Sequence, residues 1–203
     1  MGLDAIEPQA LERLWAYAQE LLRWNEKVNL TAITQPSEVV DKHLLDSLSV
    51  FPEVAGAVTL LDLGAGAGLP GIPLAVVLPT LQCTLVDAVA KKVAFMKTGA
   101  VKAGVSPRVR AVHQRVGGRP EQEGLAKAEV VISRAFMEVG AFVALAVHYL
   151  APGGRVVAML GKAPTQAELT AVGRAAGLEV VTLRELRLPG SGDPRAVATF
   201  RAS

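Results

Sequence analysis

The stretch that decides the fold is Leu60–Gly71, with the sequence LLDLGAGAGLPG. Its first residues end a short apolar run, four glycines follow within eight positions, and a helical pattern begins after them. Glycine permits positive φ and lets a ligand approach the backbone closely. The free N–H groups at the start of a helix add a partial positive charge. The pattern therefore predicts a strand, a tight glycine turn and a helix that together bind a ligand.

Two kinds of cofactor fit this turn. Gly66, Gly68 and Gly71 satisfy G-x-G-x-x-G, the fingerprint of a dinucleotide site, which is a weak signal by itself. Asp62 and Gly64 favour a different pattern, Asp-x-Gly-x-Gly, with an acid at the strand end. A carboxylate there would repel a pyrophosphate, but it would help to hold the ammonium group of a methionine moiety. S-adenosylmethionine is thus favoured over a nicotinamide dinucleotide, and a structural turn without a ligand is the weakest alternative.

Seven short runs rich in apolar and β-branched residues predict seven strands: Val58–Leu63, Gln82–Asp87, Arg108–His113, Glu129–Ser133, Gly154–Leu160, Leu178–Leu188 and Arg195–Arg201. Helical patterns separate the first six, which indicates a parallel sheet covered on both faces. Only residues 189–194 join the last two, and parallel neighbours need a crossover of about a dozen residues or more. The last two strands must therefore form an antiparallel hairpin. A seventh, antiparallel strand is typical of the α/β, Rossmann-like class I S-adenosylmethionine-dependent methyltransferases, and we expect this fold.

A second acid supports the cofactor prediction. Asp87 ends the second predicted strand, 23 residues after Gly64. In either cofactor class, an acid at that place binds the ribose hydroxyls.

The N-terminal part reads as helical. Residues 9–24 place apolar side chains at helical spacing, which predicts an amphipathic helix with a buried stripe of Leu11, Leu14, Trp15, Ala18, Leu21 and Leu22. A second helix is expected from Pro36 to about Val50. We expect a single domain over residues 1–203, with a helical N-terminal extension (1–52) and a Rossmann-like core (58–203).

The composition is that of a globular protein in a reducing compartment. Hydrophobic residues make up 51% of the 203 residues, charged residues make up 20%, and the net charge is +2. The longest apolar stretch, Val139–Leu150, is shorter than the roughly 20 residues that a membrane span needs. Cys83 is the single cysteine, and the N-terminus shows no signal-peptide pattern. We expect a cytoplasmic protein without a metal site, because three histidines and one cysteine lack ligand spacing.

The end of the fourth predicted strand reads ISRAF, residues 132–136, and the reacting atom should lie there, since ligands of open α/β sheets bind beyond the strand carboxyl ends. The segment lacks the Asn/Asp-Pro-Pro-aromatic motif of exocyclic-amine methylation and the aspartate of ribose 2′-O methylation. Cys83 is too remote to be the nucleophile of pyrimidine C5 methylation. Guanine N7 has a free lone pair and needs no general base. Arg134 is then expected to orient cofactor or base, and Phe136 either stacks on a base or packs in the core.

Four segments together resemble one family: Trp24–Thr31, His43–Ser47, the glycine loop through Pro73, and residues 132–136. From about Leu11 to Arg201 the chain is similar to the bacterial small-subunit ribosomal RNA guanine-N7 methyltransferases (the glucose-inhibited division protein B family). The resemblance implies methyl transfer from S-adenosylmethionine to N7 of one guanine in small-subunit (16S) rRNA. It implies cofactor contacts at Gly64, Leu69, Val116, Gly117 and Arg134, and at Asp87 on the ribose.

The chain departs from this family at three positions. Gly117 stands where relatives commonly have Glu, so a backbone contact would remain there and an acid-dependent contact would be lost. Leu160 stands where relatives often have Lys. Either Lys162 replaces that charge from a shifted position, or the contact with RNA differs. Arg195 matches a family arginine, but Ala196 stands where His is frequent.

Four residues are expected to contact RNA phosphates as a local patch: Lys27, Lys42, Lys162 and Arg195. The expected partner is small-subunit rRNA or the small ribosomal subunit, and the expected oligomeric state is a monomer. From the residues alone, other interpretations stay open: a small-molecule methyltransferase, a nicotinamide-dependent oxidoreductase, or a non-catalytic ribosome assembly factor that keeps this fold.

Overall fold

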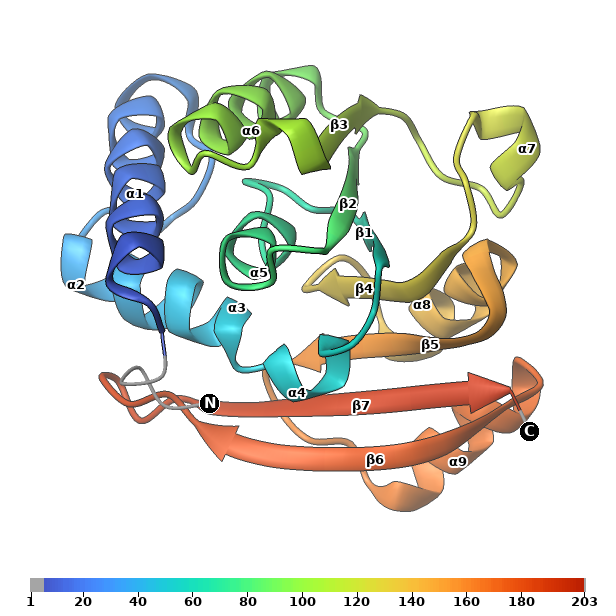
Figure 1. Ribbon diagram of the computed structural model, residues 1–203. Coiled ribbons are helices and arrows are strands. Elements are labelled where there is room, and N and C mark those ends of the chain that lie inside the picture. Colours follow the sequence, from blue (N-terminus) through green and yellow to red (C-terminus); the bar gives the residue numbers. More distant parts are fainter. Residues whose placement is uncertain (1–5, 203) are drawn as a thin grey trace.

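The computed structural model describes residues 6–202 and is drawn in Figure 1. Within these residues one seven-stranded sheet has the strand order β3-β2-β1-β4-β5-β7-β6. The first five strands pair in parallel, and β7 is antiparallel to both β5 and β6. The predicted parallel sheet with a final antiparallel hairpin is confirmed.

The strands lie close to the predicted runs. They are β1 (Thr59–Leu63), β2 (Gln82–Asp87), β3 (Val109–His113), β4 (Ala128–Arg134), β5 (Leu150–Leu160), β6 (Leu178–Arg187) and β7 (Pro194–Ala202). The largest difference is in β5, which begins four residues before the predicted Gly154. The reason is the pairing of Leu150 with Ala128 ahead of a register shift, in which the extra residues lie on β5, and the apolar pattern does not reveal this pairing.

Helices cover both faces of the sheet. The first face packs against α1 (Pro8–Val28), α5 (Gly71–Val77) and α6 (Ala90–Lys102), and the second against α8 (Val139–Ala146) and α9 (Gln166–Ala175). Neighbouring residues of β1 point to opposite sides: Leu60 belongs to the first core and Leu61 to the second. This alternation is what a strand buried on both faces requires.

The crossovers differ in their helical content. The connection from β3 to β4, where the sequence predicts a helical pattern, holds only the four-residue helix α7 (Pro120–Glu123). Short 3₁₀ turns, η3 (Ser106–Arg108) and η4 (Val147–Tyr149), precede β3 and β5. Among the described helices, none combines the length and the apolar character that a bilayer span demands.

The second N-terminal helix is confirmed, with a π-helical turn inside it. It consists of α2 (Pro36–Val39), the π-helical η2 (Val40–Leu45) and α3 (Asp46–Leu48), and a short α4 (Phe51–Val54) follows. The boundary between an N-terminal extension of residues 1–52 and a core of residues 58–203 stays a prediction.

The buried stripe of α1 is rotated from the predicted one. Leu14 and Leu21 are buried as expected, but Leu11 and Trp15 are 42% and 44% exposed, and Tyr17 is fully buried. The Tyr17 ring packs against Phe95 of α6 with 6.0 Å between ring centroids. Aromatic packing and a buried hydroxyl contact, described below, therefore decide the helix orientation rather than the count of apolar residues.

Candidate active site

The glycine turn follows β1 and is held against the end of β2. The N–H groups of Gly64 and Ala65 both donate to the carbonyl oxygen of Val86, at 2.9 and 3.0 Å. Gly64, Gly66 and Gly68 have φ values of +70°, +60° and +83°. Residues with a side chain rarely adopt such φ values, so glycine is required here. Because glycine has no side chain, the backbone of this turn is open to a ligand, as the sequence predicts.

Asp62 lies fully buried beneath this turn, and Leu69, at the far end of the turn, is also buried. The Asp62 Oδ2 accepts a 3.0 Å hydrogen bond from the N–H of Gly71, at the start of α5. Its Oδ1 is buried and has no hydrogen-bond partner among the described residues. Burial raises the pKa of Asp62 to about 8, against 3.8 in water. A carboxyl with one free buried oxygen fits a ligand that brings a cationic N–H donor.

Asp87 holds the other side of the turn. Its Oδ2 accepts from the N–H of Gly66 at 3.0 Å, and its Oδ1 accepts from the N–H of Val89 at 2.8 Å. The ammonium of Lys92 lies 3.7 Å from the same carboxylate. The two predicted acids therefore lie on neighbouring parallel strands, β1 and β2, with the glycine turn between them.

Tyr17 also contacts the glycine turn, which the sequence does not predict. Its hydroxyl donates a 2.7 Å hydrogen bond to the carbonyl oxygen of Ala67, in the middle of the glycine turn. This contact joins residues 50 positions apart. The only sequence signal is a tyrosine at i+3 from Leu14, and the partner carbonyl cannot be identified from the sequence.

Arg134 ends β4 and is held by the N-terminal helical segment. Its Nη1 donates to the carbonyl oxygen of Lys42 at 2.9 Å and to Oδ2 of Asp46 at 3.0 Å. The other oxygen of Asp46 accepts from Nε of Arg195, in β7, at 3.2 Å. Asp46 is thus a buried carboxylate between two arginines that come from different strands.

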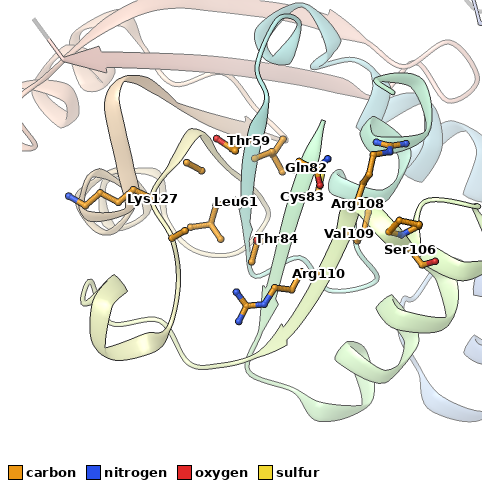
Figure 2. Close-up of a pocket in the computed structure, with 14 residues that line it drawn as sticks. Thr59, Leu61, Gln82, Cys83, Thr84, Ser106, Arg108, Val109, Arg110 and Lys127 are labelled. Carbon is orange, nitrogen blue, oxygen red and sulfur yellow. The ribbon is translucent and has the colours of Figure 1, made fainter. Parts of the chain in front are cut away.

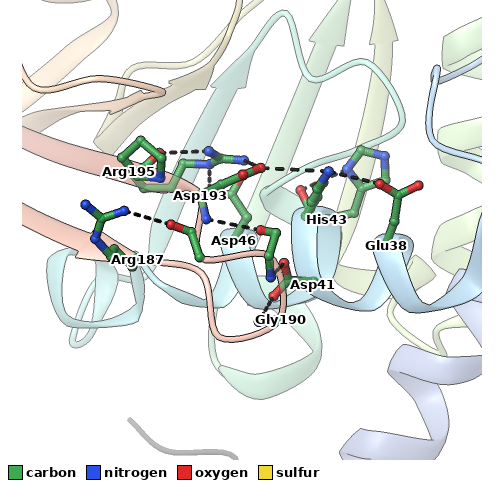
Figure 3. Close-up of polar contacts among 12 residues, drawn as sticks. Glu38, Asp41, His43, Asp46, Arg187, Gly190, Asp193 and Arg195 are labelled. Atoms are coloured by element: carbon green, nitrogen blue, oxygen red, sulfur yellow. Dashed lines mark hydrogen bonds and ion pairs between the residues drawn. The ribbon is translucent and has the colours of Figure 1, made fainter.

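The same helical segment also holds the turn between β6 and β7. The two oxygens of Asp41 accept from the N–H groups of Gly190 and Ser191, at 2.8 and 2.9 Å (Figure 3). Lys42, one residue on, forms an ion pair with Glu38 at 2.9 Å. The final hairpin is therefore attached to residues almost 150 positions earlier in the chain.

His43 is a nearly buried member of this group. Its Nε2 lies 2.9 Å from Oγ1 of Thr31, and its Nδ1 lies 3.4 Å from the Arg134 guanidinium. Burial, and then the positive charge of Arg134, lower the pKa of His43 to about 4. The imidazole is therefore neutral at physiological pH.

A cavity of about 560 Å³ lies beside Arg134. Its walls come from the N-terminal helical segment and from the carboxyl ends of β4 and β5 with the adjoining part of β7; they include His43, Asp46, Arg134, Met159, Arg195 and Val197. The strand register explains the wall: Arg134 is opposite Met159, and Met159 is opposite Val197. The cavity is large enough for a nucleobase with its sugar and combines apolar surface with a few polar groups, as small-molecule sites do.

The segment after Arg134 forms the rim of this cavity. Ala135 has φ +51°, one of two non-glycine residues with positive φ in the described chain. Phe136 and Met137 are 36% and 40% exposed. A left-handed residue between a half-buried arginine and two exposed apolar side chains is the kind of backbone irregularity that gathers at functional sites.

The remaining predicted residues lie at varied distances from these groups. Val116 is half-buried, and the N–H of Gly117 donates to Glu123 at 2.8 Å. Lys162 is exposed two residues beyond Leu160, which lines the cavity. Lys27 is exposed on α1, apart from the cavity walls. The structure therefore brings Lys42 and Arg195 to the cavity itself, with Lys162 at its edge.

A second cavity, of about 240 Å³, lies at the opposite edge of the sheet (Figure 2). The first residues of β1 to β4 line it, together with Arg108, Arg110 and Lys127. Arg108 donates to three backbone carbonyls, those of residues 75, 78 and 81. None of the predicted site residues lines this cavity. The carboxyl edge therefore remains the candidate site.

Comparisons with known proteins show what the chain is similar to. The family model described as "GidB: rRNA small subunit methyltransferase G" matches residues 10–189. A protein of Myxococcus xanthus named ribosomal RNA small subunit methyltransferase G is 58% identical over 93% of this chain and 86% of its own length. A protein of the same name from Neisseria meningitidis is 41% identical over 99% of this chain and 93% of its own length.

Solved structures with low identity share the fold. An S-adenosylmethionine-dependent methyltransferase from Thiobacillus denitrificans, in complex with S-adenosyl-L-homocysteine, matches with a TM-score of 0.59 at 17% identity, over 78% of this chain and 91% of that one. The ribosomal protein L11 methylase of Lactobacillus delbrueckii subsp. bulgaricus matches with a TM-score of 0.60 at 12% identity, over 78% and 77%.

Proposed function

The chain belongs to the rRNA small subunit methyltransferase G family, and from this premise we propose that it transfers a methyl group from S-adenosylmethionine to N7 of a guanine in small-subunit (16S) rRNA. The observation that carries the proposal is the arrangement at the carboxyl edge of the sheet. There, the glycine turn with Asp62 and Asp87 lies on β1 and β2, and the cavity beside Arg134 adjoins them on β4.

The glycine turn and its two acids are the proposed cofactor site. When bound, S-adenosylmethionine supplies a methyl group on a positively charged sulfur. The free Oδ1 of Asp62 suits the ammonium group of the methionine moiety. Asp87 is proposed to bind the ribose, and Gly64, Gly66, Gly68 and Leu69 allow the backbone to approach the ligand. Val116 and Gly117, on the loop after β3, are proposed at the adenine end.

The cavity beside Arg134 is the proposed site of the target base. Guanine offers O6 and N7 as acceptors along one edge, and N7 must keep its lone pair free to attack. The candidate donor in this cavity is Arg134, at the end of β4. It therefore serves O6 or the cofactor rather than N7. The chain needs to supply no general base for this reaction, so its work is to align the two reactants and exclude water.

The neutral His43 and the paired Asp46 agree with such a role, because both are engaged in holding Arg134. A fixed guanidinium costs no reorganisation when the base arrives.

Lys42, Lys162, Arg195 and the more distant Lys27 are proposed to contact RNA phosphates. Lys42 and Arg195 already have acidic partners, so they offer less free charge than the sequence implies. We propose that the protein acts as a cytoplasmic monomer on rRNA or on the small ribosomal subunit.

The test is to incubate the protein with methyl-labelled S-adenosylmethionine and small ribosomal subunits from cells that lack this enzyme, and then to digest the RNA. Label in N7-methylguanosine at one site is expected. Absence of label, with demonstrated binding of S-adenosylhomocysteine and an active control enzyme on the same subunits, would overturn the proposal and favour a small-molecule substrate or a role in assembly.

A further inference from the structure

The loop that follows β3 leaves the sheet beside the cofactor site. The N–H of Gln114 donates to the carbonyl oxygen of Asp87 at 3.2 Å, so the loop begins next to the acid that holds the glycine turn. From there the chain runs to α7, as Figure 1 shows. Val116 packs against the second core. This hydrogen bond therefore fixes the start of the loop 114–119.

A closed set of hydrogen bonds fixes the far end of this loop. The Oε1 of Glu123, in α7, accepts from the N–H of Gly117 at 2.8 Å and from that of Arg119 at 3.3 Å. The Oε2 of the same carboxylate accepts from the hydroxyl of Tyr149. That hydroxyl in turn accepts from the N–H of Gly118 at 2.8 Å. Two consecutive glycine N–H groups are therefore held by one carboxylate and one phenol that hydrogen-bond to each other.

The components of this set leave little freedom. The Tyr149 ring is fully buried in the second core, so its hydroxyl has a fixed position. Gly118 has φ +82°, and a β-carbon there would lie 3.0 Å from Cδ2 of His148. Burial, and then the hydrogen bond to Glu123, raise the pKa of Tyr149 to about 12, so the phenol stays a donor at any physiological pH. Networks of this kind, when fully satisfied, make a loop rigid.

We propose that Glu123 and Tyr149 are positioning residues for the adenine end of S-adenosylmethionine. The order of the strands supports this: β1 carries the acid for the methionine end, β2 carries the acid for the ribose, and β3 is next along the same edge. The inference rests on the proposed function, because it takes the cofactor to lie along that edge.

The inference also accounts for the bare backbone at residue 117. Gly117 itself has no side chain to contact a ligand or to hold its own loop. The carboxylate beside its N–H comes from six residues later in the chain. The N–H of Gly117 already donates to Glu123, so Glu123 and Tyr149 act by holding the loop in place. We assign them no direct contact with the adenine.

The test uses the full chain and four variants. Tyr149→Phe removes one hydroxyl and keeps the buried ring, Glu123→Gln keeps the shape but removes the charge, and Glu123→Ala removes the whole carboxylate. Thr165→Ala is the matched control, since it breaks the side-chain cap of α9, on the second face but away from the loop. The measurements are the Kd for S-adenosylhomocysteine by calorimetry, hydrogen exchange of the amides of 114–119, and kcat at saturating cofactor.

Tyr149→Phe is expected to raise the Kd for S-adenosylhomocysteine about tenfold, which corresponds to the loss of one or two hydrogen bonds. Hydrogen exchange should become faster only at the amides of residues 114–119, and kcat should be unchanged. Glu123→Gln should lose less affinity than Glu123→Ala, because its amide oxygen still accepts from Gly117. Thr165→Ala should change neither the Kd nor this exchange.

Two outcomes separate this inference from the proposed function. If the unaltered protein does not bind S-adenosylhomocysteine, the proposed function fails. If it binds, and Tyr149→Phe and Glu123→Gln bind equally well with unchanged exchange at 114–119, the inference is overturned. Should Tyr149→Phe not fold, Glu123→Gln alone decides between these results.

Discussion

The ring of Phe136 lies against Gly64 at the place where a β-carbon of residue 64 would be, so that an added methyl group would overlap Cδ2 of the ring. Gly64 begins the glycine turn, and Phe136 follows the end of β4. The proposed cofactor site and the rim of the proposed base site are therefore in direct contact.

Gly64→Ala should destabilise the protein and abolish binding of S-adenosylhomocysteine. A side chain at φ +70° costs about 1–2 kcal/mol, and the overlap with Phe136 adds to that cost. Gly56→Ala is the matched control, because Gly56 has φ +81° but open space around it. Urea unfolding of both variants isolates the overlap. If Gly64→Ala loses no more stability than Gly56→Ala, the ring does not restrict this position.

Asp46→Asn should slow RNA methylation much more than it weakens cofactor binding. The change removes the charge that Arg134 and Arg195 share, and loss of a buried partner costs about 1–3 kcal/mol. We expect kcat/KM for the RNA to fall about tenfold or more, with a smaller rise in the Kd for S-adenosylhomocysteine.

Glu53→Gln serves as the control for this change, because it breaks a similar ion pair with Arg184 away from the cavity. Equal losses of RNA methylation in Glu53→Gln and Asp46→Asn would show that stability, rather than the position of Arg134, explains the effect.

Cofactor binding should release a proton from Asp62. The free protein holds this carboxyl protonated at pH 7, because burial raises its pKa to about 8. An ammonium group beside it favours the carboxylate and lowers that pKa again. Calorimetry at pH 7 in buffers of different ionisation enthalpy should therefore give release of up to one proton, which Asp62→Asn should remove. Binding without any proton exchange in the unaltered protein would exclude contact between Asp62 and the ammonium group.

His43 should make the protein lose stability as the pH falls from about 6.5 to 4. Its folded-state pKa of about 4 lies below the ordinary 6.5, so the unfolded chain binds the proton first and is favoured in that range. Linkage predicts a loss of about 2 kcal/mol between pH 7 and 4.5 from this residue alone. The comparison is with His43→Gln, which cannot titrate; parallel pH profiles of the two free energies of unfolding would refute the assignment.

RNA methylation should fall steeply with salt, whereas binding of S-adenosylhomocysteine should be nearly insensitive to it. Each phosphate contact adds about one unit to the slope of log affinity against log salt. Lys162→Gln should reduce the slope by about one unit, and Lys97→Gln, on an exposed position of α6, should leave it unchanged. Equal salt slopes for the two ligands would argue against a phosphate-binding patch.

Much of the fold follows from local sequence patterns. The glycine turn, the strand runs and the short connection at 189–194 each have one physical solution, and the structure has adopted it. Local patterns fail where a distant partner decides. The apolar pattern predicts that Trp15 is buried. In the structure Tyr17 is buried instead, because its hydroxyl donates to the carbonyl oxygen of Ala67.

The candidate site shows the same division. The acids at the ends of β1 and β2, and Arg134 at the end of β4, could be identified because strand ends are visible in the sequence. Glu123 and Tyr149 could not, since each is an ordinary residue until the fold brings it to the loop after β3. Charge is equally ambiguous in sequence: Arg195 looked like a free phosphate contact, and only the structure pairs it with Asp46.

The double use of Asp46 also sets an order of events during synthesis. A ribosome makes Asp46 and Arg134 well before Arg195, and the turn that Asp41 holds lies just before β7. Until that strand emerges, the helical segment lacks the arginine and the backbone N–H groups that satisfy its two buried acids. The site beside Arg134 therefore gains all the partners of its two acids only after residue 195 has been synthesised.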